Sequence, residues 1–124
     1  MSDNDLELAR QFLATLAGAA QTGDREALLP FLASDVEWVT AKRDLHGIDE
    51  VRAQLTWLSP SDTLDVEFDE PALTDCGDGR VVSDVHETYR LKRTGEFGYA
   101  RDRRIDLTIR AGKIARYEMQ VITA

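Results

Sequence analysis

Cysteine, basic charge and long apolar runs are all scarce in this sequence. Its single cysteine, Cys76, excludes an internal disulfide and a cysteine-based zinc site. No stretch approaches the ~20 consecutive apolar residues that a membrane helix requires. The acidic start, residues 1–7, lacks the basic first segment and apolar core of a signal peptide. We therefore expect a cytoplasmic protein with no membrane partner.

Acidic residues outnumber basic ones by 23 to 15, which gives a net charge of −8. This balance argues against a nucleic-acid partner, because phosphates attract basic surfaces. The charge is uneven, since residues 1–79 carry −12 and residues 80–124 carry +4. Two readings stay open: two differently solvated halves, or a basic half that attracts an anionic ligand or an acidic partner.

The first part of the chain has the apolar periodicity of helices. We expect a long helix to Ala20, a short one containing Pro30 that follows Gly23, and a third at 48–58, with a strand at 35–40 before the third. Residues 41–47 read as a loop. At 124 residues, the chain is expected to be a single domain, 1–124.

The second part alternates apolar and polar residues, as half-buried strands do. We expect strands at 64–69, 80–93, 97–110 and 113–123, with a turn at 75–79. Helices followed by a meander predict an α+β fold: three N-terminal helices packed in the concavity of a curved, mostly antiparallel sheet.

Three charged residues occupy positions where the alternation predicts apolar ones. Glu87 falls on the apolar face of strand 80–93, and Arg101 and Arg103 fall on the apolar face of strand 97–110. Burying an unpaired charge costs several kcal/mol. These residues therefore either pair with one another or line a cavity, and residues opposite or diagonal on neighbouring strands lie within ~5–8 Å.

The order of elements resembles the nuclear transport factor 2-like superfamily, in particular its SnoaL-like and ketosteroid isomerase-like branch. Nearly the whole chain takes part in the resemblance. It rests on the segments 30–38 (PFLASDVEW) and 45–52 (LHGIDEVR), on three long C-terminal strands, and on the AGKI turn at 111–114.

This resemblance implies a cone-shaped sheet whose wide mouth is a pocket for a small apolar metabolite. The pocket would belong to an isomerase, a cyclase or a hydrolase; alternatively, the domain is a non-catalytic ligand-binding or dimeric assembly module in which Glu87 and Arg101 or Arg103 form a structural ion pair. A homodimer through the outer faces of the long strands is also implied. The expected ligand-binding residues are Phe12, Leu16, Trp38, Tyr89, Tyr99, Arg101, Tyr117 and Met119.

The catalytic residues of the relatives match this sequence poorly. Ketosteroid isomerases use a helix tyrosine, an aspartate base and a protonated aspartate. The matching positions here hold Phe12 or Leu16, Thr40 and Ile105. Limonene epoxide hydrolase uses an Arg-x-Asp motif and a second aspartate; here Val85, Glu87 and Met119 match, so one carboxylate remains.

Three roles for the charged residues stay open. Glu87 and the arginines form a structural ion pair, or an arginine binds a carboxylate, phenolate or carbonyl of a ligand, or Glu87 and Arg103 are catalytic, as acid/base and oxyanion stabiliser. Whether the protein is an enzyme is left undecided. His86 lies on the polar strand face and His46 in a loop; with no third ligand at metal spacing, we predict no metal and no cofactor.

Overall fold

One open sheet of seven strands carries the helices on a single face. The computed structural model describes residues 2–24, 26–54 and 62–123. The helical elements are α1 (Ser2–Thr22), the 3-10 helix η1 (Glu26–Phe31) and α2 (Ile48–Gln54). The strands are β1 (Leu32–Val39), β2 (Asp44–His46), β3 (Leu64–Phe68), β4 (Ala72–Gly77), β5 (Arg80–Leu91), β6 (Phe97–Arg110) and β7 (Lys113–Thr123). Within the described ranges no helix is long and apolar enough to cross a membrane.

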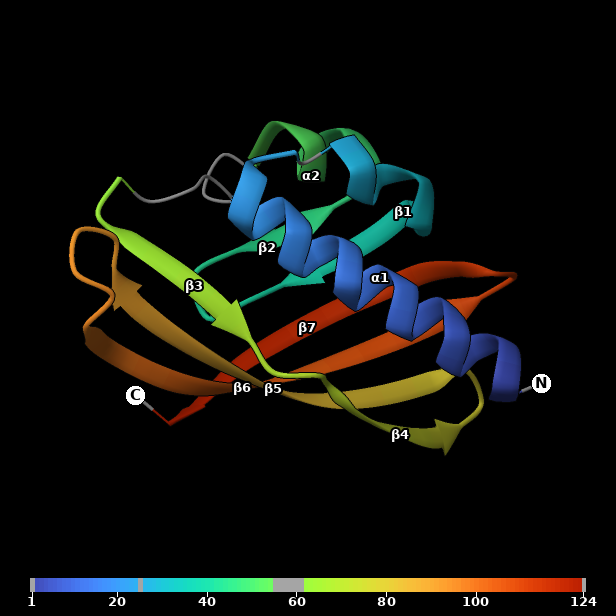
Figure 1. The fold of residues 1–124 in the computed structure, drawn as a ribbon. Helices are drawn as coiled ribbons and strands as arrows, with labels where there is room; N and C mark the ends of the chain where they lie inside the picture. Colours follow the sequence, from blue (N-terminus) through green and yellow to red (C-terminus); the bar gives the residue numbers. More distant parts are fainter. Residues whose placement is uncertain (1, 25, 55–61, 124) are drawn as a thin grey trace.

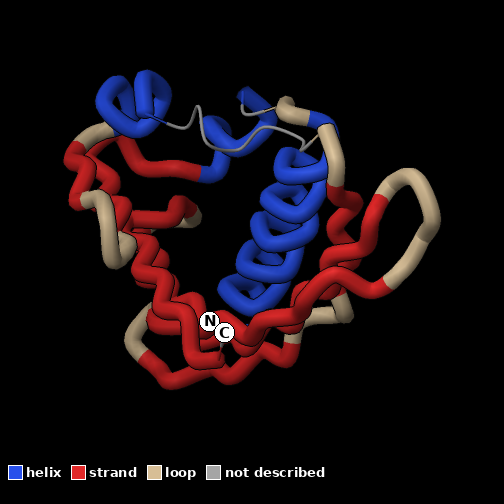
Figure 2. The backbone as a smooth tube through the Cα atoms, turned by 90° about the vertical axis from the view of Figure 1, so that its left-hand side faces the viewer, coloured by secondary structure: helices blue, strands red, loops and turns tan. Residues whose placement is uncertain are grey.

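The strand order is β2-β1-β7-β6-β5-β3, and β4 pairs with β5 beyond the end of β3. Only β1 and β7 pair in parallel; the other neighbours are antiparallel. The sheet curves around α1, with strands beneath the helix and on both sides of it (Figures 1 and 2). The concave face of the long strands therefore looks toward α1.

The helical layer differs from the expected three packed N-terminal helices. Within the described ranges only α1 is long, at 21 residues, whereas η1 has six residues and α2 has seven. Pro30 lies inside η1 and has no amide hydrogen to donate, which keeps this segment short. The strands β1 and β2 separate α2 from η1. Residues 55–58 of the expected third helix lie outside the described residues.

Two short strands were not predicted. The segment expected to be a loop contains β2, which has one buried side chain, Leu45, and pairs with β1. Ala72–Gly77 forms β4, which continues the edge begun by β3 and takes up the first three residues of the turn expected at 75–79. Such short edge strands contain too few alternating apolar residues to be recognised. β1 also begins at Leu32, three residues before the expected start.

The predicted alternation of the long strands is confirmed. In β5 the buried side chains are those of Val81, Ser83, Val85 and Glu87. In β6 they are those of Arg103, Ile105, Leu107 and Ile109. Because α1 covers this face, the apolar members form the core, and any charged member must find its partner there.

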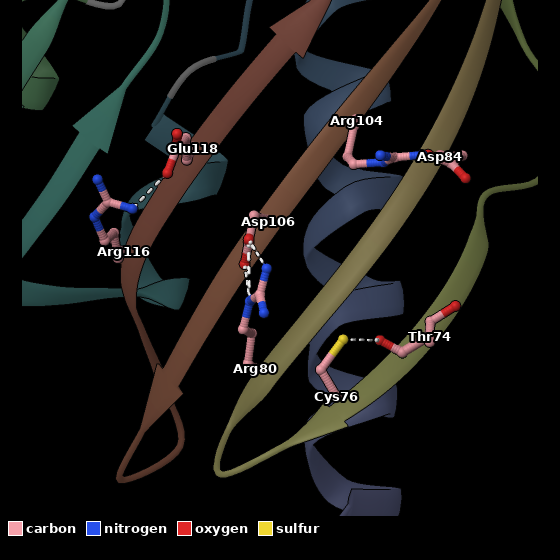
Figure 3. Close-up of polar contacts among 8 residues, drawn as sticks. All are labelled: Thr74, Cys76, Arg80, Asp84, Arg104, Asp106, Arg116 and Glu118. Carbon is pink, nitrogen blue, oxygen red and sulfur yellow. Dashed lines mark hydrogen bonds and ion pairs between the residues drawn. The ribbon is translucent and has the colours of Figure 1, made fainter. Parts of the chain in front are cut away.

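The opposite face of the sheet carries ion pairs between neighbouring strands. Arg104 pairs with Asp84 at 3.0 Å, and Arg80 pairs with Asp106 at 2.6 Å. Figure 3 shows these side chains on the side of the strands away from α1. The two faces of β5 and β6 therefore differ sharply: the outer face holds exposed pairs, and the inner face holds one buried cluster.

Candidate functional site

The three charged residues predicted to share the inner face meet in one cluster. The strand register sets Glu87 directly opposite Arg101, and Val85 opposite Arg103, which puts Arg103 diagonal to Glu87. Arg101 donates a hydrogen bond from Nε to Glu87 Oε1 at 2.7 Å. Arg103 Nε lies 2.8 Å from the same oxygen. The carboxylate thus receives both guanidinium groups on Oε1.

Tyrosines close the other side of this carboxylate. Tyr89 donates its hydroxyl hydrogen to Glu87 Oε2 at 3.1 Å, and Arg101 donates to the Tyr89 oxygen at 3.3 Å. Tyr99 stacks on Tyr89 with ring centroids 4.4 Å apart. Burial and the Glu87 charge raise the pKa of Tyr89, so its hydroxyl stays protonated and remains a donor at neutral pH. Both oxygens of Glu87 are therefore occupied.

The contact of Arg103 with Glu87 has the distance of a hydrogen bond but not its direction. Although the Nε to Oε1 distance is 2.8 Å, the Arg103 Nε hydrogen has no acceptor in line within the described part of the chain. The contact is therefore an electrostatic one. The Arg103 guanidinium also approaches Tyr117, whose pKa is raised by burial to about 12 although the positive charge opposes this.

The exposures of the three charged groups differ. The side chain of Glu87 is 3% exposed and that of Arg103 is 9% exposed, whereas that of Arg101 is 33% exposed. Burial would lower the pKa of Arg101, but the hydrogen bond and charge of Glu87 outweigh it and raise the pKa. With both arginines charged, the cluster holds one carboxylate against two guanidinium groups and carries a net charge of +1.

A cavity of about 410 Å³ opens beside this cluster, between α1, the end of β3 and the segment that links β3 to β4. Arg103 and Val85 form its sheet side. The remaining wall residues are Arg10, Leu13, Ala14, Ala17, Gln21, Phe68, Asp69, Glu70 and Pro71. The volume falls within the ~300–1,000 Å³ typical of small-molecule sites. Of the three charged residues on the inner face, Arg103 is the one that reaches this wall.

The aromatic residues expected to bind ligand lie in two places. Phe12, Leu16, Trp38 and Tyr117 are buried in the core, where Trp38 stacks on Tyr117 at 3.9 Å. Phe12 packs edge-on against both of those rings. None of these four residues lines the 410 Å³ cavity. Their role as ligand contacts stays a prediction.

Of the other expected contacts, Tyr89, Tyr99 and Arg101 lie near Glu87, whereas Met119 does not. Tyr89 and Arg101 are half-buried there, and Tyr99 is exposed. Met119 packs against the core from β7, opposite Ile105. Tyr89 and Arg101 thus touch the charged cluster, whereas the cavity lies on its Arg103 side.

The helix and edge residues of the cavity were not recognised in the sequence. Ala14 and Ala17 lie on the side of α1 that faces the β3–β4 edge, and their small side chains leave the space open. Gln21 ties the end of α1 to that edge by donating to the Val66 carbonyl at 3.2 Å. Ala14 and Ala17 lie three residues apart, but α1 also buries Ala9 and Ala19 in the core, so small residues alone did not mark the cavity in the sequence.

The histidines take no part in the cluster. His86 lies on the outer sheet face, with Nδ1 2.6 Å from Asp102 Oδ1. The pKa of His86 is raised by its hydrogen bond to Asp102. His46 is exposed in β2 and lies 3.1 Å from Asp44. Among the described residues, no three His, Cys, Asp or Glu side chains converge at a geometry that could hold a metal ion.

Comparison with protein families finds one match, which covers most of the chain. The family model of the SnoaL-like domain matches residues 9–117. No curated protein matches the sequence significantly.

Many solved structures share this architecture at low sequence identity. An NTF2-like protein from Anabaena variabilis has a TM-score of 0.77 and 18% identity over 100% of this chain and 93% of its own. A protein from Bacillus subtilis, provisionally named an isomerase, has a TM-score of 0.73 and 13% identity over 94% and 88%. A protein from Catenulispora acidiphila with a ketosteroid isomerase-like fold, in complex with trimethylamine, has a TM-score of 0.64 and 15% identity over 88% and 83%. These similarities establish the fold.

Proposed function

Because the chain belongs to the SnoaL-like domain family, we propose that it binds a small, largely apolar molecule in the cavity beside α1. One observation carries the proposal: Arg103 is both a wall of this cavity and a partner of the buried Glu87. Ligand sites typically combine apolar walls with a few fixed polar groups. Here Leu13, Val85 and Phe68 supply apolar walls, and Arg103 supplies the polar group.

In this proposal Glu87 is a positioning residue. It does not line the cavity, and its two oxygens are engaged by two arginines and Tyr89. The carboxylate restricts the Arg103 side chain to one position, and its single negative charge is shared between Arg103 and Arg101. An arginine fixed in this way loses less side-chain freedom when it binds a ligand, which favours affinity.

The proposal is tested by filling the cavity. Ala17→Leu adds three carbon atoms to a wall residue that is not a member of the charged cluster. The matched control is Ala53→Leu, on an exposed position of α2 outside the cavity wall. A library of small metabolites is screened by thermal shift, since a ligand that binds only the folded state raises the unfolding temperature. Compounds that stabilise the wild type and Ala53→Leu, but not Ala17→Leu, support the proposal; equal stabilisation of all three proteins refutes it.

A second candidate is an enzyme in which Glu87 acts as acid or base. Two observations favour it: among the described residues Glu87 Oε2 accepts its hydrogen bond from the neutral hydroxyl of Tyr89, and the partly exposed Arg101 could stabilise an oxyanion beside it. The similar Bacillus subtilis protein also carries the provisional name of an isomerase. The reaction class would be proton transfer next to a carbonyl, or a cyclisation or hydrolysis of a small metabolite.

The enzymatic candidate makes its own prediction. Glu87→Gln should abolish turnover of any substrate found in the screen, while circular dichroism shows a folded protein. Ligand affinity at the cavity should then fall far less than turnover, because Arg103 keeps its place in the wall. Unchanged turnover in Glu87→Gln would remove Glu87 from the chemistry and leave the non-catalytic proposal.

The homodimer, implied by family resemblance, stays a prediction. Its surface would be the outer face of β5 and β6, which presents the ion pairs of Figure 3. Light scattering during size exclusion should report twice the mass of one chain at micromolar concentration. A particle with the mass of a single chain would refute it. A dimer that persists while no ligand is found in the screen would favour the remaining alternative, an assembly module with a structural ion pair.

A further inference from the structure

The cavity beside α1 has two electrostatically different ends. At its inner end lie Arg103 and Val85, both buried. At its outer end lie Asp69 and Glu70, both exposed in the segment between β3 and β4. Leu13, Ala14, Ala17, Phe68 and Pro71 form apolar walls. A molecule that fills the cavity therefore meets a guanidinium at one end and carboxylates at the other.

The inner end has an unused positive charge. Glu87 compensates only one of its two guanidinium neighbours, and Arg101 forms the better-directed bond of the two. The Nε hydrogen of Arg103 has no acceptor in line within the described part of the chain. A buried guanidinium with a spare charge is satisfied best by a carboxylate, which can accept two parallel N–H bonds.

The outer end has the opposite charge. Asp69 and Glu70 are opposed there by one arginine, Arg10, which already pairs with Glu7 on α1 at 3.1 Å. A second carboxylate at the far end of a ligand would therefore be repelled.

We propose that the ligand is a monocarboxylate with an apolar body, and that it enters the cavity carboxylate first to pair with Arg103. This inference rests on the proposed function and adds the chemical class and the orientation of the ligand. Two groups decide them: Arg103 selects the carboxylate, and the acids at the mouth reject dicarboxylates of similar length.

Hexanoate, hexanamide and adipate are suitable probes, because they share a six-carbon chain and differ in the charge at their ends. Their affinities are measured by isothermal titration calorimetry and by ligand-observed NMR at constant ionic strength. We expect hexanoate to bind at least tenfold more tightly than hexanamide and at least tenfold more tightly than adipate. Equal binding of hexanoate and hexanamide would overturn the chemical class; equal binding of hexanoate and adipate would overturn the role of the mouth.

Variants of the two ends test the same points separately. The double variant Glu87→Gln, Arg103→Met removes both buried charges, leaves the partly exposed Arg101, and should abolish the preference for hexanoate over hexanamide. Arg103→Lys keeps the charge and should keep the preference. Glu70→Lys reverses one charge at the exposed mouth; it should raise adipate affinity at least fivefold and change hexanamide affinity less than twofold.

Failure of this inference is distinguishable from failure of the proposed function. If all three probes bind equally and Ala17→Leu blocks them while Ala53→Leu does not, the cavity is a ligand site and the carboxylate selectivity is wrong. If Ala17→Leu leaves the binding of every probe unchanged, the cavity is not the site, and both proposals fall. Absence of binding by hexanoate and by the four- to ten-carbon homologues, in a protein that the library stabilises through the same cavity, also overturns the inference.

Discussion

Replacing Glu87 with glutamine should destabilise the protein strongly, because it leaves a buried guanidinium without its counter-charge. Arg103 has a 9% exposed side chain and lies 2.8 Å from the carboxylate. Breaking a buried pair by removing one partner costs about 3–5 kcal/mol. Glutamine keeps the shape of the side chain and one acceptor oxygen, and Arg101 is partly hydrated. We therefore expect the lower end of this range, a loss of about 3 kcal/mol in the free energy of unfolding.

The control lies on the same pair of strands. Asp84 pairs with Arg104 at 3.0 Å on the opposite face of the sheet, and both side chains are more than half exposed. Asp84→Asn should cost less than about 1 kcal/mol. The comparison therefore holds the strands and the chemistry of the substitution constant and changes the burial of the pair.

Urea unfolding followed by circular dichroism measures both variants. For a domain of this size, a loss of 3 kcal/mol corresponds to a fall of about 10 °C in the midpoint of thermal unfolding. Adding Arg103→Met to Glu87→Gln should recover part of the loss, because apolar replacement of a whole buried pair is close to neutral. A Glu87→Gln cost within about 0.5 kcal/mol of the Asp84→Asn cost, or a double variant less stable than Glu87→Gln alone, would refute the reasoning.

Three further outcomes follow from pKa values and from backbone geometry. The pKa of His86 should lie above its usual 6.5 by NMR and fall in Asp102→Asn; the stability difference between these proteins should be largest in acid and vanish as pH rises through the raised pKa. Burial raises the pKa of Tyr117 to about 12, against 10 in the unfolded chain, so the free energy of unfolding should fall as pH rises between these values. In an alkaline ultraviolet titration, Tyr117→Phe should lack the last step. Gly79→Ala, whose Cβ would lie 2.3 Å from a β6 carbonyl oxygen, should cost clearly more than Gly95→Ala, which has a similar positive φ and open space.

The long strands were predictable because their pattern is local. Alternation alone placed Glu87, Arg101 and Arg103 on the inner face, since successive side chains of a strand point to opposite sides. The short strands β2 and β4 escaped prediction, because each exists only through pairing with a longer neighbour. The helical segment with Pro30 was expected to be short, and η1 has six residues; its apolar spacing did not show that it is a 3-10 helix.

The sequence by itself determined that Glu87, Arg101 and Arg103 share a face, and it left open whether they pair or line a cavity. It also indicated the family, through the order of its elements. The tertiary structure decided which arginine faces a cavity, because that depends on how α1 crosses the sheet. Ala14 and Ala17 leave room against β3 and β4, whereas Phe12 and Leu16 fill the core. The orientation of a helix on a sheet arises from packing between distant segments, which no local pattern contains.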